Sequence, residues 1–501
     1  MSLGKPENLF DLFGARFAAA GEKTAFAAPD GRPLMTYAGL SKGAAHYANA
    51  LENLGVCPGA RVTVQAEKSI SSVLLYLACL KCGAIYQPLN TAYTAAEVEY
   101  FVGDAQPQLI VCDPKDQAAM RALANRLGIF AVLNLDAKGD GSMADLARRM
   151  EHRHQTAPCA RDDLAGLLYT SGTTGRSKGA MLSHGNLSSN ALTLHKLWAF
   201  APDDVLLHVL PFFHVHGLFV ALHTAFLNAS TILWFEKFDR EAVLDAIPRA
   251  TVMMGVPTFY TRLLSSPRLG ADLCKDMRLF ISGSAPLLAE THREFEHRTG
   301  HAILERYGMT ETGMITSNPY AGARLPGTVG HALPDVSVRI KDQPGVIEVK
   351  GPNVFKGYWR MPEKTAEDFT ADGYFITGDV GVMAEDGRVS IVGRAKDLII
   401  SGGFNVYPKE VEDAIDAIPG VIESAVIGAP HPDFGEGVVA VLTANGPLPT
   451  ERDMIAALAE RLAKFKTPKR IFIVDSLPRN TMGKVQKAEL RKRYAGAFTS
   501  A

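Results

Sequence analysis

Short apolar runs alternate with polar segments over the N-terminal part of the chain. Each run is followed by glycine, proline or charged residues, and then by a stretch with the spacing of an amphipathic helix. Such runs are found at 62–70, 108–112, 205–213, 251–257 and 278–283. A repeated order of strand, loop and helix is typical of mostly parallel sheets covered by helices. The pattern therefore predicts an α/β fold for this region.

The pattern changes after about Arg324. Three short segments, 336–340, 345–351 and 387–393, alternate apolar and polar positions and are separated by glycines and prolines. Alternation with a period of two is typical of strands that have one solvated face, as antiparallel strands commonly do. We therefore predict an antiparallel, barrel-like sheet in this part of the chain.

The last hundred residues have a pattern of their own. Two amphipathic helical stretches, 409–418 and 451–465, flank two alternating strands, 424–431 and 437–444. A chain of 501 residues is too long for a single hydrophobic core and should divide into domains. We place the boundary near Lys396, which gives an N-terminal domain of residues 1–395 and a C-terminal domain of residues 396–501.

Composition excludes several classes of protein. The chain has 52 lysines and arginines against 53 acidic residues, so no basic excess indicates nucleic acid as a partner. Acidic residues near the start argue against a signal peptide. Polar residues interrupt the most apolar stretch, 217–235, so we expect a buried helix followed by a strand and no membrane partner. The six scattered cysteines indicate a reducing, cytoplasmic location, and Cys79 and Cys82 are expected in the core.

A loop rich in glycine and hydroxyl groups follows the apolar run 164–170. The sequence YTSGTTGRSKG at 169–179 brings together small residues, hydroxyls and Lys178. Glycines let the backbone approach a phosphate closely, hydroxyls donate hydrogen bonds, and a lysine adds charge. The spacing differs from that of a P-loop, in which a glycine precedes the lysine. The loop therefore predicts a polyphosphate site outside the P-loop class.

Further motifs follow in a fixed order along the chain. The first three are a loop with two histidines, a turn of small residues, and a segment with tyrosine, threonines and a glutamate. The later ones contain an aspartate, a glycine pair and a lysine. The motifs are PFFHVHGL at 211–218, ISGSAPL at 281–287, RYGMTETG at 306–313, YFITGDVG at 374–381, GRAKDLIISGGFNVYPKEVE at 393–412 and NTMGKVQK at 480–487.

Taken together, these motifs resemble those of the adenylate-forming superfamily, which includes acyl-CoA synthetases, adenylation domains and luciferases. The resemblance covers nearly the whole chain. It implies two α/β subdomains plus a β-barrel, followed by a small, mobile α+β C-terminal domain. It also implies an acid–thiol ligase that uses ATP, Mg²⁺ and coenzyme A. A carboxylate first becomes an acyl-adenylate, and the thiol of coenzyme A then displaces AMP.

The resemblance assigns roles to the matching residues. The nucleotide would contact the glycine-rich loop, the turn of small residues, the following aromatic segment and the start of the C-terminal domain. These cofactor-binding residues are Thr170, Ser171, Gly172, Thr173, Thr174, Lys178, Gly283, Ser284, Ala285, Pro286, Arg306, Tyr307, Gly308, Met309, Asp379, Arg394, Lys396, Ser401, Gly402 and Gly403. Mg²⁺ would bind Glu311 and Thr170. Lys484 would contact the reacting carboxylate and α-phosphate, and Glu311, Thr310 and His214 complete the catalytic set.

The two half-reactions need different surfaces of the C-terminal domain. The resemblance implies that this domain rotates about Lys396 between the two steps. The segment with Ser401, Gly402 and Gly403 would then face the thiol of coenzyme A. A lid that closes differently for each step is a gating device. The resemblance also suggests that a lysine acetyltransferase and a deacetylase act on Lys484, since acetylation removes its charge.

The acyl group is the least constrained part of the prediction. Pro257 is expected to start a helix that places Phe259 and Arg262 toward one side. A buried arginine needs an anion, and a dicarboxylic substrate supplies one. The pattern looks like that of malonyl-CoA synthetases, in which Arg262 and Ser284, with His214 or His216 and Met309 nearby, would bind the distal carboxylate of malonate. Methylmalonate would be a side substrate, because one methyl group discriminates weakly.

Other functions fit part of the pattern. A medium-chain or aryl acyl-CoA synthetase would need an apolar pocket without a paired arginine. Arg262 would then be an ordinary surface arginine. A stand-alone enzyme that loads a carrier protein would be favoured by a fused carrier domain, and a luciferase differs only in its pocket. A catalytically silent nucleotide-binding protein would be favoured by loss of Lys484 or Glu311, and both are present.

Overall fold

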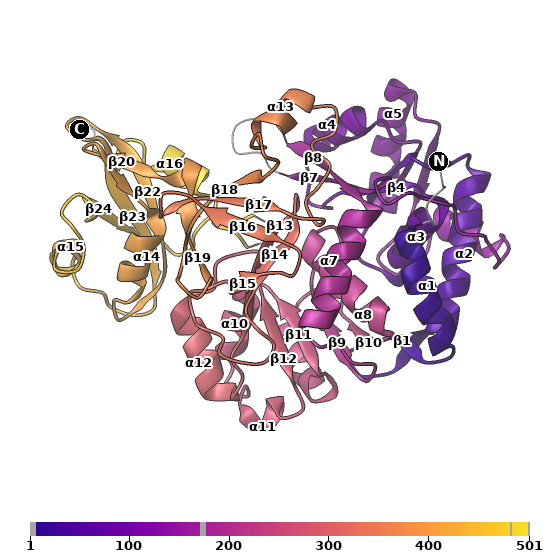
Figure 1. Cartoon of the computed structure of the whole chain (residues 1–501), viewed down its shortest axis with the longest axis horizontal. Coiled ribbons are helices and arrows are strands. Elements are labelled where there is room, and N and C mark those ends of the chain that lie inside the picture. The colour runs from indigo at the N-terminus through magenta and orange to yellow at the C-terminus, as the bar shows by residue number, and fades with distance from the viewer. Residues whose placement is uncertain (1–6, 171–176, 481–482, 499–501) are drawn as a thin grey trace. The chain divides into compact units, whose positions relative to one another are not determined.

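The computed structural model describes residues 7–170, 177–480 and 483–498 (Figure 1). The chain divides into two compact units. Unit 1 comprises residues 1–326, 330–337 and 350–375, and unit 2 comprises residues 327–329, 338–349 and 376–501. Lys396 lies inside unit 2, so the boundary at residues 395/396 stays a prediction.

Two large sheets form unit 1. The nine-stranded sheet has the order β15 (His331–Ala332), β14 (Gly313–Ser317), β13 (Leu304–Met309), β12 (Leu279–Ser282), β11 (Val252–Gly255), β9 (Val205–His208), β10 (Thr231–Trp234), β1 (Thr24–Ala27) and β2 (Pro33–Thr36). The six-stranded sheet has the order β6 (Ala131–Asn134), β5 (Leu109–Cys112), β3 (Arg61–Gln65), β4 (Ile85–Pro88), β7 (Leu164–Thr170) and β8 (Lys178–Ser183). The inner strands pair in parallel, which confirms the α/β prediction.

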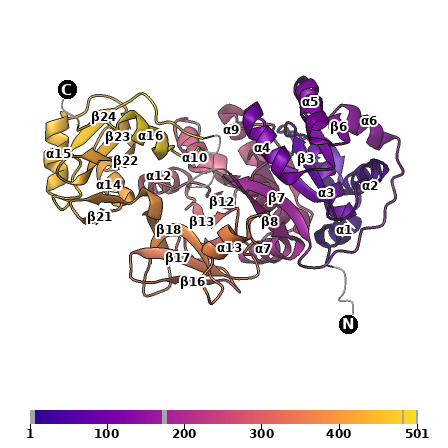
Figure 2. The same ribbon diagram turned by 90° about the horizontal axis from the view of Figure 1, so that it is seen from above.

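Helices connect and cover these strands (Figure 2). They are α1 (Leu9–Ala20), α2 (Tyr37–Asn53), α3 (Ile70–Cys82), α4 (Ala95–Ala105), η1 (Pro114–Asp116), α5 (Gln117–Leu127), α6 (Ser142–Arg148), α7 (His184–Leu197), η2 (His216–Ala221), α8 (Leu222–Asn228), α9 (Arg240–Ala246), η3 (Ile247–Arg249), α10 (Pro257–Leu264), α11 (Ala271–Cys274), α12 (Ala289–Thr299) and α13 (Pro362–Glu367). Serine or threonine side chains cap α2, α3, α4 and α7 at their N-termini, which satisfies backbone donors that have no partner within the helix.

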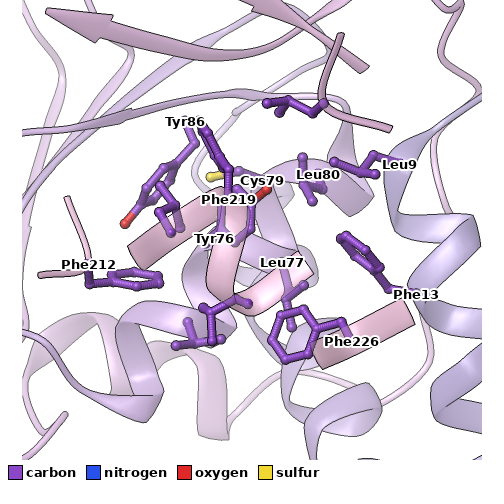
Figure 3. Close-up of a cluster of buried hydrophobic side chains, with 14 of the residues drawn as sticks. Leu9, Phe13, Tyr76, Leu77, Cys79, Leu80, Tyr86, Phe212, Phe219 and Phe226 are labelled. Atoms are coloured by element: carbon purple, nitrogen blue, oxygen red, sulfur yellow. The ribbon is translucent and has the colours of Figure 1, made fainter. Parts of the chain in front are cut away.

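The core of unit 1 is rich in aromatic side chains. Figure 3 shows Phe13 of α1, Tyr76 of α3, and Phe219 and Phe226 of η2 and α8 gathered in one buried cluster. The apolar stretch 217–235 forms η2, α8 and β10, which confirms a buried helical segment followed by a strand. Among the residues that the structure describes, none of the helices is both long and apolar enough to span a bilayer.

All six cysteines lie in unit 1 and carry free thiols. Cys57 is exposed, and the other five are buried: Cys79, Cys82, Cys112, Cys159 and Cys274. Cys79 and Cys82 belong to the core cluster, as predicted. Burial raises the pKa of the Cys82 thiol to about 12.

Unit 2 is built from two smaller sheets. The first has the order β16 (Ser337–Ile340), β17 (Gly345–Lys350), β18 (Phe375–Met383) and β19 (Val389–Arg394), and corresponds to the predicted barrel-like segment; a few of its end residues belong to unit 1. The second has the order β21 (Phe404–Val406), β20 (Ile399–Ser401), β23 (Gly435–Ala444) and β22 (Val421–His431), with β24 (Arg470–Ile473) beside β23. Its helices are η4 (Ala395–Asp397), α14 (Pro408–Asp416), α15 (Glu451–Ala459) and α16 (Lys487–Arg493).

Candidate active site

A polar cluster lies where β7 ends and β8 begins. Thr170 Oγ1 donates a hydrogen bond of 3.2 Å to Glu311 Oε1, and the Tyr358 hydroxyl lies 3.4 Å from the same oxygen. Glu311 is only 5% exposed, so water screens its carboxylate little and its electrostatic effect on neighbouring groups is strong. Burial, reinforced by Glu311 and Asp368, raises the pKa of Tyr358, which therefore stays a neutral donor. Glu311 and Thr170, predicted to share a metal ion, are in contact. Tyr358 was not predicted, because it is far from both in the sequence.

Lys178 has two contacts in the same cluster. Its Nζ lies 3.3 Å from Asp368 Oδ2 and 4.2 Å from the centre of the Tyr358 ring. Both side chains of this ion pair are largely buried, which strengthens the attraction relative to an exposed pair. The Tyr100 hydroxyl donates to the carbonyl of Ser177 and so anchors the end of the loop. The predicted phosphate contacts Ser171, Gly172, Thr173 and Thr174 lie outside the described residues.

A second cluster surrounds the turn of small residues after β12. Ser284 Oγ lies 3.2 Å from His216 Nδ1, and the backbone N–H of His216 donates to His214 Nδ1. His216 is 1% exposed, whereas His214 is half-buried. Of the two histidines that the sequence left open, His216 is therefore the one that faces Ser284. Ser284 has a φ of 71°, an uncommon left-handed conformation for a residue other than glycine, asparagine or aspartate.

Arg306 lies against the same turn. A Cβ on Gly283 would come within 2.4 Å of the guanidinium carbon of Arg306, so only glycine allows this approach. Arg306 is 3% exposed, and its Nε and Nη2 have no hydrogen-bond acceptor among the residues that the structure describes. Burial lowers the pKa of Arg306 to about 9, although Tyr260 and Glu305 oppose the shift. Burial and the nearby Arg306 in turn lower the pKa of His216, which stays neutral.

Arg262 lies elsewhere than expected. It is in the last turn of α10, which begins at Pro257 as predicted, but its side chain is exposed. Phe259 is only half-buried, stacked on Phe238, while Leu263 occupies the core. The expectation of a buried arginine at this position is wrong, because residue 262 is oriented away from the face that Leu263 buries. Its proposed contact with a substrate stays a prediction.

The remaining predicted residues of unit 1 lie on or beside the β13–β14 hairpin and the β12 turn. Tyr307 is buried in β13, and Met309 and Thr310 are half-buried at the hairpin. A Cβ on Gly308 would lie 2.1 Å from the Gly313 carbonyl, so this glycine is required by the tight pairing of the two strands. Of the β12 turn, Ala285 is half-buried and Pro286 is exposed.

A small, mostly apolar cavity of about 20 Å³ has Thr310 in its wall and could hold about one water molecule. Its walls come mainly from α7 and η2, and include Leu187, Ala191, Leu194, Phe219 and Val220. Asn190 and His223 add polar groups to these walls.

Unit 2 carries the predicted ribose and thiol residues. Asp379 of β18 pairs with Arg394 of β19, and Arg394 Nε lies 2.7 Å from Asp379 Oδ1. Ser401 is buried, and Gly402 and Gly403 form a two-residue hairpin loop with φ values of 60° and 82°. Positive φ at both positions is the reason for the glycine pair.

The two predicted lysines of unit 2 are exposed. Lys396 is in η4, directly after β19. Lys484 belongs to a turn in which its backbone N–H donates to Asn480 Oδ1 and its carbonyl accepts from the Asn480 N–H. Residues 481 and 482 of this turn lie outside the described residues.

Comparisons with known proteins agree with this arrangement. The family described as AMP-binding enzyme matches residues 13–359, and its C-terminal domain matches residues 410–484. The chain belongs to the AMP-binding enzyme family. Its mixed α/β fold, with a large N-terminal and a small C-terminal region, is therefore confirmed.

Individual relatives cover nearly the whole chain. ATP-bound MatB from Rhodopseudomonas palustris is 53% identical, with a TM-score of 0.95 over 99% of this chain and 100% of that chain. A malonate–CoA ligase of Arabidopsis thaliana is 35% identical over 88% of this chain and 79% of its own length. A feruloyl-CoA synthase of an Amycolatopsis species is 36% identical over 93% and 95%.

Proposed function

We propose that this protein ligates malonate to coenzyme A in two steps. A carboxylate oxygen of malonate attacks the α-phosphorus of ATP, which forms malonyl-adenylate and expels pyrophosphate. The thiolate of coenzyme A then attacks the acyl carbon, which forms malonyl-CoA and expels AMP. Similarity to the malonate–CoA ligase of Arabidopsis thaliana and to MatB supports this reaction class.

The observation that carries the choice of malonate is the burial of Arg306. Two of its nitrogen atoms, Nε and Nη2, have no acceptor among the described residues, and an unpaired buried charge is costly. The second carboxylate of malonate would accept from both. Each charge-assisted hydrogen bond contributes about 1.5–3 kcal/mol, which is sufficient to discriminate against monocarboxylates.

Ser284 and His216 would complete the site for this second carboxylate. His216 Nε2 is buried and has no partner among the described residues. When Ser284 donates to His216 Nδ1, the neutral imidazole carries its proton on Nε2 and offers it to an anion. The acyl site would thus combine one full charge with neutral donors, which fits a single carboxylate. Arg262, exposed at the end of α10, would contact the substrate only from the solvent side.

The cluster at the end of β7 fits a metal-bound triphosphate. Glu311 and Thr170 present hard oxygen donors, which suit Mg²⁺. Bound there, Mg²⁺ would neutralise phosphate charge. Lys178 would leave Asp368 for a phosphate oxygen, and Thr310 and His214 would lie near the reacting carboxylate.

Unit 2 would serve the two steps with different residues. Asp379 and Arg394 would bind the ribose, and Lys484 would stabilise charge on the α-phosphate during adenylation. Ser401, Gly402 and Gly403 would approach the pantetheine thiol after rotation about Lys396. Lys484 is exposed, as a substrate of an acetyltransferase must be, and acetylation would remove its charge.

A second candidate substrate is a medium-chain or aryl acid. Similarity to the feruloyl-CoA synthase favours it. In that case, the substrate would supply no carboxylate to Arg306, and malonate would be a poor substrate.

Pyrophosphate release with coenzyme A and a panel of carboxylates tests the proposal. The panel contains acetate, malonate, methylmalonate, succinate, octanoate and coumarate. We expect a clear preference for malonate, and a loss of roughly 30-fold or more in kcat/KM for malonate in Arg306→Met. Activity with monocarboxylates should change little in this variant.

Two variants serve as controls. Arg298→Met removes a half-buried arginine that donates to backbone carbonyls and pairs with Glu294, and should leave selectivity unchanged. Arg262→Ala measures the contribution of the exposed arginine separately. A preference of the wild type for octanoate or coumarate would contradict the proposal and favour the second candidate.

A further inference from the structure

A buried lysine joins the two sheets of unit 1. Lys68 follows β3 of the six-stranded sheet and directly precedes Ser69, which caps α3. Its ammonium group contacts the end of β9 in the nine-stranded sheet. Lys68 Nζ lies 2.9 Å from His208 Nδ1, 3.0 Å from the His208 carbonyl oxygen and 4.2 Å from the centre of the Trp234 ring.

Each N–H donor of the Lys68 side chain has an acceptor. A lysine has three N–H donors, and here an imidazole nitrogen, a carbonyl and an aromatic face receive them. Lys68 is 8% exposed and His208 is 1% exposed. Burial of a lysine costs desolvation free energy, and these three contacts offset part of that cost for Lys68. An apolar side chain of similar length would join the two sheets without that cost.

The network continues from His208 toward the acyl site. His208 Nε2 lies 3.0 Å from the carbonyl oxygen of Gly217. A carbonyl oxygen can only accept, so His208 Nε2 carries the proton and donates it to Gly217, which leaves Nδ1 of the neutral ring to accept from Lys68. Lys68 and the Gly217 carbonyl together hold the ring in one tautomer and one orientation. Burial lowers the pKa of His208 well below its usual range, which agrees with a neutral ring. Burial also lowers the pKa of Lys68, although Glu236 opposes the shift, and its amine has N–H donors in either protonation state.

Gly217 directly follows His216, the residue that faces Ser284. Both belong to η2, a one-turn π-helix, a type of structure frequent at functional sites. A Cβ on Gly217 would lie 2.1 Å from the Pro211 carbonyl, so the turn is packed closely against the preceding loop. The position of His216 thus depends on how the Gly217 carbonyl is held.

We infer that Lys68 and His208 are positioning residues of the acyl site, which hold His216 against Ser284 through the Gly217 carbonyl. The inference rests on the proposed function for the identity of the substrate, and on the hydrogen bonds above for the mechanism. Neither residue touches the substrate. Loss of Lys68 would free the imidazole of His208, release Gly217 and let His216 leave the position in which it can donate to a carboxylate.

Lys68→Met tests this inference, with Lys81→Met as the matched control. Lys81 is also 8% exposed and lies at the end of α3, but it contacts the Phe10 ring and Thr156 Oγ1, away from β9. Both variants should lower the Tm. Only Lys68→Met should raise the KM for malonate, by roughly tenfold, with a smaller change in kcat and with monocarboxylates little affected.

Two further measurements distinguish positioning from simple stabilisation. In a double-mutant cycle, Lys68→Met and His208→Asn should be non-additive in kcat/KM, because both break one chain of hydrogen bonds. The ¹⁵N chemical shifts of the His216 ring should change in Lys68→Met and stay unchanged in Lys81→Met. Should Lys68→Met fail to fold, His208→Asn alone, which breaks the same chain of hydrogen bonds, is compared with Lys81→Met in the same assays.

Equal losses of Tm in the two lysine variants, with unchanged malonate KM and unchanged His216 shifts, would overturn the inference. Its failure is distinguishable from failure of the proposed function. If the wild type prefers another carboxylate, the function is wrong, while the His216 shifts still decide whether Lys68 positions this ring.

Discussion

Asp379 and Arg394 form an ion pair across two antiparallel strands, with 2.7 Å between Oδ1 and Nε. The two residues come from separate motifs, and strand pairing in unit 2 places them opposite each other. Asp379 is 3% exposed, so the guanidinium group both compensates and orients a buried carboxylate. An oriented carboxylate is a suitable acceptor for the two hydroxyls of a ribose.

Replacement of Asp379 should weaken nucleotide binding. Asp379→Asn keeps the shape but removes the charge that strengthens the hydrogen bonds to the ribose. We expect the KM for ATP to rise roughly tenfold or more, with a smaller change in the KM for malonate. Steady-state kinetics with varied ATP measures this. Asp386→Asn is the control, since Asp386 pairs with Arg388 in the turn between the same strands. An equal effect of both variants on ATP would contradict the assignment.

Asp368 should compete with ATP for Lys178. The carboxylate lies 3.3 Å from Lys178 Nζ and 2.9 Å from Lys364 Nζ. If Lys178 binds a phosphate of ATP as proposed, this phosphate would displace the carboxylate. In Asp368→Asn, we expect tighter ATP binding, by about two- to fivefold in Kd, because the competing charge is gone. Calorimetric titration with ATP and Mg²⁺ measures the change. Glu367→Gln, which removes only the exposed partner of Lys364, should leave the Kd unaltered. Weaker ATP binding in Asp368→Asn would show that Asp368 supports the site instead.

Lys484 should act in only one of the two steps. We expect Lys484→Ala to reduce adenylation from ATP by roughly 100-fold or more, because a donor to developing charge on the α-phosphate is lost. Thioester formation from supplied malonyl-adenylate should be close to that of the wild type. Rapid-quench assays of each half-reaction measure this, with Lys492→Ala as an exposed control on α16. Equal losses in both half-reactions would argue against separate surfaces for the two steps.

Asp416 should make unit 2 less stable as the pH rises. Burial raises its pKa to about 7 from an ordinary value of 3.8, against a hydrogen bond from Ser424 that lowers it. Between about pH 4 and pH 7, the folded state keeps a proton that the unfolded state releases, so stability falls across this window. Asp416→Asn stays neutral and avoids the loss.

Thermal unfolding at two pH values measures the effect of Asp416. We expect similar Tm values for Asp416→Asn and the wild type near pH 4, and a Tm that is higher in the variant by roughly 2–4 °C or more above about pH 7. Asp475→Asn, at an exposed position of unit 2, controls for a general change of charge. A Tm difference that does not vary with pH would exclude titration of Asp416 as its cause.

Much of the fold was predictable because its signals are local. The apolar runs at 108–112, 251–257 and 278–283 contain β5, β11 and β12, and the glycine pair Gly402–Gly403 forms a hairpin turn. Each depends on a period of apolar positions or on a backbone conformation that glycine allows.

The candidate site was predictable only in part, because burial is a property of the packed chain. Arg262 follows Phe259 by one helical turn, yet α10 leaves it in solvent, whereas Arg306 in a β-strand is enclosed by the Gly283 turn. Lys68 and His208 are 140 residues apart, and no periodicity relates them. The cluster of Asp368 and Tyr358 with Lys178 was missed for the same reason. A lysine between an apolar strand and an apolar helix, as Lys68 is, was the only local sign.

The distribution of thiols makes the chain convenient for spectroscopy. Cys57 is the exposed cysteine of unit 1, and the remaining five are buried in that unit. A maleimide dye would therefore modify the native protein at one position, without deletion of other cysteines. One cysteine introduced on the surface of unit 2 would supply a second attachment point. A donor and acceptor pair placed in this way would report, molecule by molecule, how the distance between the two units changes as ATP, malonate and coenzyme A are added.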